Sequence, residues 1–178
     1  MKQTVKITGG EYSGRTIKTP GGETHPMGER ERLVLFNMIL PYLRNSSVLD
    51  LYCGGGTLGI EALSRGATRA IFVDNSGKAI SVAKQNCQDL AIEEDRWETV
   101  ISDTSRFMEY VDNQYDLVFA DPPYDNYSPE MVRGISKIIA EGGIFVLSHP
   151  DKTPELIDLK LLKSHKYANA HISVYLKG

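Results

Sequence analysis

The chain has 178 residues, of which 41% are hydrophobic and 24% charged, a balance typical of one globular domain with a sizeable core. Its net charge of −3 gives no sign that the surface as a whole binds nucleic acid. No apolar run approaches the ~20 residues that span a bilayer, and the first ten residues lack the apolar core of a signal peptide, so we expect a cytoplasmic protein that does not bind membranes.

The N-terminal part of the chain carries two different patterns. Residues Val5–Thr19 alternate like β-strands around Gly-Gly and Ser-Gly turns, which predicts a small hairpin. We assign this hairpin to an extension of residues 1–24 and the remainder, 25–178, to the main domain. Helical spacing then appears in four apolar residues, Leu33, Phe36, Ile39 and Leu40. Pro41 marks the expected end of this helix.

From Ser47 onward, apolar runs alternate with amphipathic segments. Strands are expected at 47–52, 69–74, 97–102, 115–121 and 142–149, and helices at 57–66, 77–90, 105–110 and 128–140. The tail from Leu159 is expected to form two strands joined near Ala168–Ala170. Strands separated by helices are parallel and buried on both faces, whereas a final pair without a helix between them is antiparallel. The predicted fold class is therefore α/β, with a three-layer, mostly parallel, Rossmann-like sheet and an antiparallel C-terminal strand.

A glycine loop follows the first strand of this pattern. Gly54, Gly56 and Gly59 match G-x-G-x-x-G, and Asp74 follows about twenty residues later, as in dinucleotide-binding folds, so an NAD oxidoreductase is one alternative. However, Asp50 stands four residues before Gly54, where a carboxylate would repel a pyrophosphate at the helix N-terminus. S-adenosylmethionine has no phosphate, and its sulfonium, ammonium and ribose hydroxyls suit nearby carboxylates. The loop therefore favours S-adenosylmethionine as the cofactor.

Acidic residues at the ends of four predicted strands make up most of the candidate cofactor site. We expect Asp50 near the methionine end, Asp74 on the ribose hydroxyls and Asp103 near the adenine amine, although each could instead cap a turn or helix, and for Asp103 alone the cap is favoured. The candidate cofactor residues are Asp50, Tyr52, Gly54, Gly56, Asp74, Asn75, Asp103 and Asp121. Cys53 in the same loop is expected to be a small loop residue rather than a reactive thiol. With Cys87 as the only other cysteine, no metal site is expected.

The strand at 115–121 ends in the sequence Asp-Pro-Pro-Tyr. An exocyclic amine of a base must become more pyramidal before it attacks a methyl group, and two acceptors on its hydrogens would favour that change. The Asp121 carboxylate and the Pro122 carbonyl can act as such a pair, which the rigid Pro122-Pro123 corner holds in place. The carboxylate can also take the proton released after transfer, and Tyr124 offers a face on which the base can stack. The alternative is that the prolines merely end the strand and Tyr124 packs.

These motifs carry a resemblance to a known family. The stretches "ITGGEYSGRTIKTP", "HPMGERERLVLFNMI", "VLDLYCGGGTLGIEALSRGA" and "DPPY" resemble the RsmD family of bacterial guanine-N2 methyltransferases of small-subunit ribosomal RNA. The resemblance implies a seven-stranded class I methyltransferase fold with a small N-terminal β-extension, S-adenosylmethionine as methyl donor and a guanine amine as acceptor. His25 and Met27 stand where the family usually has Arg and Thr. The alternatives are an adenine-N6 methyltransferase acting on RNA or DNA and an RNA-binding module without catalysis.

The distribution of charge suggests where RNA is bound. Residues 1–44 carry seven Lys and Arg against four Asp and Glu, whereas residues 45–178 carry thirteen against nineteen. Such a basic arm could bind phosphates, although a merely solvated surface explains the asymmetry about as well. The candidate RNA contacts are Lys6, Arg15, Lys18, Arg30 and Arg32. Because Arg30 and Arg32 point to different helix faces, one of them is free to bond within the protein. The expected partner is ribosomal RNA or a small-subunit particle, bound by a monomer.

Overall fold

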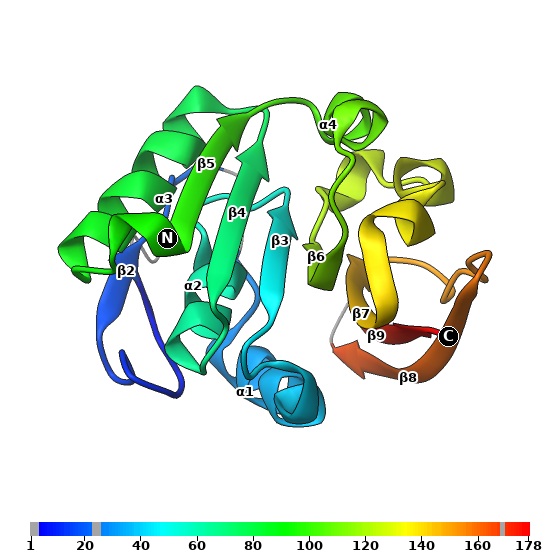
Figure 1. Ribbon diagram of the computed structural model, residues 1–178, viewed down its shortest axis with the longest axis horizontal. Coiled ribbons are helices and arrows are strands. Elements are labelled where there is room, and N and C mark those ends of the chain that lie inside the picture. The colour runs from blue at the N-terminus through cyan, green and yellow to red at the C-terminus, as the bar shows by residue number, and fades with distance from the viewer. Residues whose placement is uncertain (1–3, 23–25, 168–169) are drawn as a thin grey trace.

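The computed structural model describes residues 4–22, 26–167 and 170–178. Its central element is a seven-stranded sheet in the order β5-β4-β3-β6-β7-β9-β8, which runs across Figure 1. The strands are β3 (Ser47–Leu51), β4 (Arg69–Asp74), β5 (Trp97–Ile101), β6 (Tyr115–Ala120), β7 (Ile139–His149), β8 (Leu159–Tyr167) and β9 (Ala170–Lys177). The first five pair in parallel, and β9 is antiparallel to both β7 and β8. The predicted mostly parallel sheet with an antiparallel C-terminal strand is therefore confirmed.

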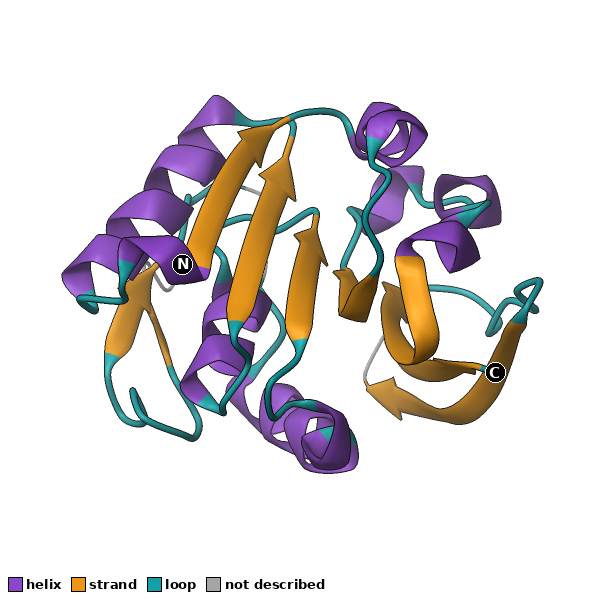
Figure 2. Cartoon of the chain, in the orientation of Figure 1, coloured by secondary structure: helices purple, strands orange, loops and turns teal. Residues whose placement is uncertain are grey.

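Helices and short helical turns cover both faces of the sheet (Figure 2), which confirms the three-layer arrangement. The helices are α1 (Glu29–Met38), α2 (Thr57–Ser64), α3 (Gly77–Asp89) and α4 (Thr104–Tyr110), and the 3-10 turns are η1 (Leu40–Tyr42), η2 (Glu94–Arg96), η3 (Tyr124–Asn126), η4 (Pro129–Val132) and η5 (Ile135–Ile138). One core joins α1, α2 and α3 to the sheet, and a second joins α4, η4 and η5 to the opposite face. Across the described residues, the structure has no helix that is both long and apolar enough to cross a membrane.

The N-terminal extension contains the predicted hairpin. Its two antiparallel strands are β1 (Thr4–Lys6) and β2 (Thr16–Lys18). Three of its side chains are buried in the same core as α1, α2 and α3, namely Ile7, Tyr12 and Ile17. The Lys18 backbone also exchanges two hydrogen bonds of 2.9 Å with the Asn86 side chain on α3. The extension therefore packs firmly against the main domain. The boundary expected between residues 24 and 25 lies outside the described residues and stays a prediction.

The face that α1 and its C-terminal cap bury agrees only in part with the predicted one, because Phe36 and Ile39 are buried as expected. Leu33 and Leu40 are 42% and 54% exposed, although their spacing predicted a place in the core. The residues that α1 and its C-terminal cap bury are Arg32, Leu35, Phe36 and Ile39. A pattern of apolar residues treats Arg32 as a surface position, whereas in the structure it forms an ion pair with the buried Glu61 of α2. At the start of the helix, the buried Arg32 therefore takes the core position that the pattern predicted for Leu33.

The helix predicted at 128–140 is wrong. Two short 3-10 turns, η4 and η5, occupy this segment, and β7 begins at Ile139, three residues earlier than expected. Gly134 separates the turns with a φ of 77°, a left-handed conformation that glycine adopts without steric cost. The helical spacing of Val132, Ile135 and Ile138 nevertheless marks residues that pack into the second core. The pattern therefore predicted correctly which residues are buried, but it predicted one α-helix where the structure has two 3-10 turns.

Candidate active site

The candidate site lies at the carboxyl ends of the parallel strands. The register of the strand pairs brings the ends of β4 and β6 to either side of the end of β3. Asp50 lies on β3, Asp74 ends β4 and Asp121 follows β6, while Asp103 follows β5 at the edge of the sheet. The four acids predicted to share one rim therefore do so, at the edge where open α/β sheets bind ligands. We call this edge the acidic rim.

Asp50 is the most deeply buried member of the rim, at 1% exposure. Its Oδ2 accepts a hydrogen bond of 2.9 Å from the backbone N–H of Gly59 in α2. A Cβ atom at Gly59 would lie 2.4 Å from a ring carbon of Phe72, so glycine permits this close approach of helix and strand. Burial raises the pKa of Asp50 well above its usual range despite the Gly59 bond, and the charges of Asp121 and Asp74 raise it further. Asp121 and Asp74 therefore both disfavour a negative charge on Asp50.

The glycine loop is attached to this cluster through Asp74. The Asp74 carboxylate accepts 2.9 Å hydrogen bonds from the backbone N–H groups of Gly54 and Ser76. Gly54 has a φ of 53°, and a Cβ built on it would have no described atom within 4 Å, so the space above this loop is open. Gly56, with a φ of 81°, begins α2 as its N-cap. The loop thus presents open backbone beside a carboxylate, as the motif predicts.

Three neighbours of the rim have more local roles. Tyr52 has a left-handed φ of 56°, and burial raises the pKa of its phenol, which hydrogen-bonds with Thr104. Asp103 is exposed and caps α4, because its Oδ1 accepts from the N–H groups of Ser105 and Arg106 at 3.0 and 3.3 Å. This is the capping role favoured from the sequence, while a contact of Asp103 with adenine stays a prediction. Asn75 is exposed directly after Asp74.

The Asp-Pro-Pro-Tyr corner is joined to strand β7 by a residue that the sequence did not indicate. The Ser148 hydroxyl forms hydrogen bonds with both the Asp121 carboxylate and the Tyr124 hydroxyl. Burial raises the pKa of Asp121 to about 6, and the Ser148 bond opposes that rise. Pro122 is buried and Pro123 exposed, while Tyr124 is 39% exposed. The only available signal for Ser148 was a polar residue at the end of an apolar strand next to β6.

Two titratable residues near the site are held in inactive states. His149 is fully buried, with Nδ1 2.9 Å from the Asp151 carbonyl and Nε2 2.8 Å from Ser173 Oγ. Burial lowers its pKa, so the ring is neutral at pH 7 and both nitrogens are engaged. Burial also raises the pKa of the Cys53 thiol well above its usual range. Neither residue therefore has the character of a general base or a reactive nucleophile, and for Cys53 this agrees with the expectation from the sequence.

The predicted RNA contacts differ in their environments. Arg32 is 1% exposed and donates to the carbonyls of Met27 and Lys6 at 2.6 and 2.5 Å, so its assignment as a phosphate contact was wrong. Its guanidinium is needed to compensate buried Glu61, 3.4 Å away. The remaining four, Lys6, Arg15, Lys18 and Arg30, are exposed. Of the two residues that depart from the family pattern, Met27 packs against the first core, and His25 lies outside the described residues.

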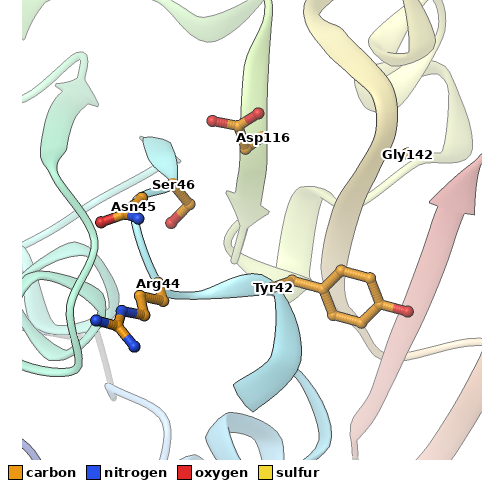
Figure 3. A pocket seen from close by; sticks show the side chains of 6 residues that line it. All are labelled: Tyr42, Arg44, Asn45, Ser46, Asp116 and Gly142. Atoms are coloured by element: carbon orange, nitrogen blue, oxygen red, sulfur yellow. The ribbon is translucent and has the colours of Figure 1, made fainter.

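A cavity of about 230 Å³ lies away from the acidic rim. Figure 3 shows side chains of Tyr42, Arg44, Asn45, Ser46 and Asp116 around it, and Gly142 completes the lining. Ser46 and Asp116 adjoin the amino ends of β3 and β6, so this cavity opens at the opposite edge of the sheet. It has no share in the candidate site. In the ranges that the structure describes, no three His, Cys, Asp or Glu side chains are grouped so that they could hold a metal ion.

Comparison with known proteins gives consistent matches along the chain. The model of the family described as "Conserved hypothetical protein 95" matches residues 5–176. The chain is 30% identical over 183 residues to the "Putative rRNA methyltransferase YlbH" of Bacillus subtilis, which covers 97% of this chain and 99% of that protein. It is 34% identical over 126 residues to the "Ribosomal RNA small subunit methyltransferase D" of Haemophilus influenzae, covering 69% of this chain and 65% of that protein. The solved structure of yhhF from Escherichia coli has the same fold, with a TM-score of 0.87, 23% identity and 98% of both chains covered.

Proposed function

Because this chain belongs to the RsmD-like family described as conserved hypothetical protein 95, we propose that it transfers a methyl group from S-adenosylmethionine to the N2 amine of a guanine in small-subunit ribosomal RNA. The observation that carries the proposal is the position of Asp121. Asp121 follows β6, the strand next to β3, and belongs to the same acidic rim as Asp50 and Asp74. Its carboxylate forms a hydrogen bond with Ser148. A methyl donor bound along the rim and an amine held by Asp121 would therefore be neighbours.

The rim fits S-adenosylmethionine on physical grounds. A buried carboxylate whose pKa is raised by burial and by two neighbouring acids is stabilised when a cation is brought beside it. Open space above Gly54 leaves room for a ligand against the backbone. Each oxygen of Asp74 uses one lone pair for a backbone N–H and retains another that can accept from a ribose hydroxyl. When bound, S-adenosylmethionine supplies an electrophilic methyl group on its sulfonium.

The residues of the chain then position the amine and remove its proton. At pH 7 a carboxyl group with a pKa of about 6 is mostly ionised, so Asp121 can accept a hydrogen bond from the amine. The Pro122 carbonyl is the second acceptor in this proposal, because the prolines on either side of it fix the corner. After the methyl group has moved, Asp121 is the acceptor for the released proton. The buried and neutral His149 is not needed for this step.

Tyr124 is the proposed platform for the base. Its side chain is partly exposed, and its hydroxyl is fixed by Ser148, so the ring is oriented before a base arrives. Stacking on an aromatic ring contributes about 1–3 kcal/mol per base and tolerates different bases. Stacking alone therefore does not select guanine over adenine. The choice of guanine comes from the family, and adenine-N6 methylation is the alternative for the same acceptor pair.

Ribosomal RNA is the proposed substrate because the chain resembles RNA methyltransferases over most of its length. Such a substrate would place the enzyme in the cytoplasm. The exposed residues Lys6, Arg15, Lys18 and Arg30 remain proposed contacts to phosphates. Whether the substrate is naked RNA or a small-subunit particle, a monomer with one acidic rim is sufficient for the chemistry.

The test is the nucleoside composition of small-subunit ribosomal RNA in a strain that lacks this protein. Mass spectrometry should show the loss of one N2-methylguanosine, restored by the wild-type chain and not by D121A. Loss of N6-methyladenosine instead would establish the adenine alternative. An unchanged nucleoside composition would contradict ribosomal RNA methylation by this protein.

A further inference from the structure

Edge strand β8 exposes three lysines without compensating acids. Its sequence from Leu159 to Tyr167 contains Lys160, Lys163 and Lys166 and no Asp or Glu. All three lysines are exposed, and none of them forms an ion pair with any residue that the structure describes. An unpaired ammonium group on the surface is free to bind a phosphate.

Two basic residues of the N-terminal extension, unlike the lysines of β8, form hydrogen bonds or ion pairs within the protein. Arg15 donates a hydrogen bond of 2.9 Å to the backbone carbonyl of Asp89, and Lys18 forms an ion pair of 3.3 Å with the Asp89 carboxylate. Hydrogen bonds from Gln85 and then Lys18, with the charges of Lys18 and Arg15, lower the pKa of Asp89, so part of the positive charge is balanced within the protein. The extension therefore offers less uncompensated charge than its sequence suggests.

The topology brings β8 to the acidic rim. Because β9 is antiparallel to both of its neighbours, β8 runs in the same direction as β7, and its carboxyl end lies at the same edge as the carboxyl ends of the parallel strands. Lys166 pairs with His171, which pairs with His149, the residue after Ser148. Two strand spacings separate Lys166 from His149, roughly 10 Å. A nucleotide near the rim is thus within reach of RNA held along β8.

Aromatic and cationic groups continue this surface toward α1. The rings of His165 and Tyr167 lie 4.6 Å apart at the end of β8. Burial and the charge of Glu31 raise the pKa of Tyr167, and the charge of Arg30 lowers it, so the first turn of α1 lies beside this end of the strand. Arg30 is exposed. Basic residues interleaved with aromatic rings suit a single-stranded nucleic acid, whose phosphates pair and whose bases stack.

We propose that β8, together with Arg30, holds the phosphates of the RNA next to the modified nucleotide. The inference rests on the proposed function and adds to it a main RNA-binding surface outside the N-terminal extension. It is supported by charge complementarity: residues 45–178 have six more acids than Lys and Arg, so a polyanion is repelled from most of the body and attracted where lysines stand unpaired. The competing occupant of an exposed edge strand is a second copy of the chain, paired edge to edge.

The test compares RNA affinity across a salt series for the wild type and the double variant K163A/K166A, with a small-subunit ribosomal RNA transcript as the probe. Each lost phosphate contact reduces the steepness of log K against log salt by about 0.7 for a single strand. The variant should therefore bind RNA more weakly, and its slope should be less steep by about 1.4. The matched control is R44A/K137A, which removes two positive charges near the amino ends of the strands, far from the rim. This control should keep the wild-type slope.

Cofactor titration and circular dichroism of the same variants separate the possible outcomes. A flatter salt slope for K163A/K166A alone, with S-adenosylmethionine affinity and folding unchanged, is the expected result. If the plots of log K against log salt for the wild type and K163A/K166A superimpose, the role of β8 is overturned and the proposed methyl transfer is left intact. A wild type that binds no RNA transcript would likewise overturn the role of β8 in holding RNA. A wild-type dimer that K163A/K166A converts to a monomer in sedimentation would show that β8 is a protein interface instead.

Discussion

The Asp74 carboxylate at the end of β4 accepts a hydrogen bond of 2.9 Å from the Gly54 amide, and this bond ties the glycine loop after β3 to the neighbouring strand. The other oxygen accepts from Ser76 at the same distance. Asp74 therefore shapes the loop before any ligand arrives, and each of its oxygens retains a lone pair beyond the one used by the backbone N–H. The anchoring of the loop and the proposed binding of a ribose predict a defined response to substitution.

Replacing Asp74 by alanine should weaken S-adenosylmethionine binding rather than the chemical step. Hydrogen bonds to a charged group contribute about 1.5–3 kcal/mol each, so we expect at least a tenfold loss of affinity. Asp74→Asn keeps one acceptor oxygen and should lose less. Isothermal titration measures both variants. An affinity equal to that of the wild type in Asp74→Ala would reduce Asp74 to a structural anchor of the loop.

Substitutions of Asp103 can separate its capping of α4 from its proposed contact with S-adenosylmethionine. Asp103→Ala removes the acceptor that caps α4 and should cost about 1 kcal/mol of unfolding free energy. Asp103→Ser keeps a capping oxygen but shortens the side chain, so it should retain most of that stability. If Asp103 also contacts the adenine amine, both variants should bind S-adenosylmethionine more weakly. Equal affinity in both, measured beside urea unfolding, would leave Asp103 as a cap alone.

The raised pKa of Asp121 predicts how stability depends on pH. Asp121 has a pKa of about 6 in the folded protein, above the ordinary aspartate value of 3.8, so folded chains bind more protons than unfolded ones between these pH values. The contribution of Asp121 to stability is therefore fully present below the unfolded pKa and is lost as the pH rises through 6. Asp121→Asn should remove this loss and stabilise the protein by about 1–3 kcal/mol near pH 8, with little effect near pH 4.

Urea unfolding at pH 4 and pH 8 measures the difference in unfolding free energy between the wild type and Asp121→Asn. Because the charge of Asp121 is one cause of the raised pKa of Asp50, Asp121→Asn also lowers the pKa of Asp50, which adds to the stabilisation expected near pH 8. A variant that is less stable than the wild type at pH 8 would show that the Asp121 carboxylate stabilises the fold, contrary to this account.

The buried ion pair between Arg32 and Glu61 is expected to matter for folding and not for RNA binding. Arg32→Met leaves a buried carboxylate with one less partner, which costs about 3–5 kcal/mol in comparable sites. Because Arg65 also contacts Glu61 at 3.3 Å, we expect the lower end of this range. Arg30→Ala, on the exposed face of the same helix, is the matched control and should change stability by less than about 0.5 kcal/mol. Denaturant unfolding that finds Arg32→Met as stable as Arg30→Ala would contradict this role.

Most of the acidic rim could be predicted from the sequence, because strand ends in a parallel sheet share one edge. Asp74 and Asp121 end apolar runs and Asp50 lies one residue before the end of β3, and the βαβ order of the chain places those strand ends together without further information. The glycine loop was predictable for a similar reason, since its spacing reflects local backbone requirements. The sequence therefore contains the elements of this site that depend on local conformation and chain order.

What the sequence could not predict depends on tertiary contacts. Ser148 lies 24 residues from Tyr124, and nothing in the spacing marks their hydrogen bond. Arg32 resembles any surface residue of an amphipathic helix, and only the packing of α1 against α2 reveals its partner Glu61. The segment 128–140 has helical spacing of apolar residues, but Gly134, in a left-handed conformation, divides it into two short turns. In each case the deciding interaction is between distant residues or in the backbone.

The central claim is that Asp121 directs methyl transfer to a guanine amine, and a single-turnover assay with purified protein tests it most directly. Small-subunit ribosomal RNA from cells lacking the protein is mixed with enzyme and S-adenosylmethionine carrying a labelled methyl group, and the labelled nucleoside is identified by mass spectrometry. We predict N2-methylguanosine with the wild type and a rate about 10²–10³ lower with Asp121→Ala, because one preorganised polar group aimed at the transition state is lost. Near-normal transfer by Asp121→Ala, in a variant that binds S-adenosylmethionine as the wild type does, would contradict the account.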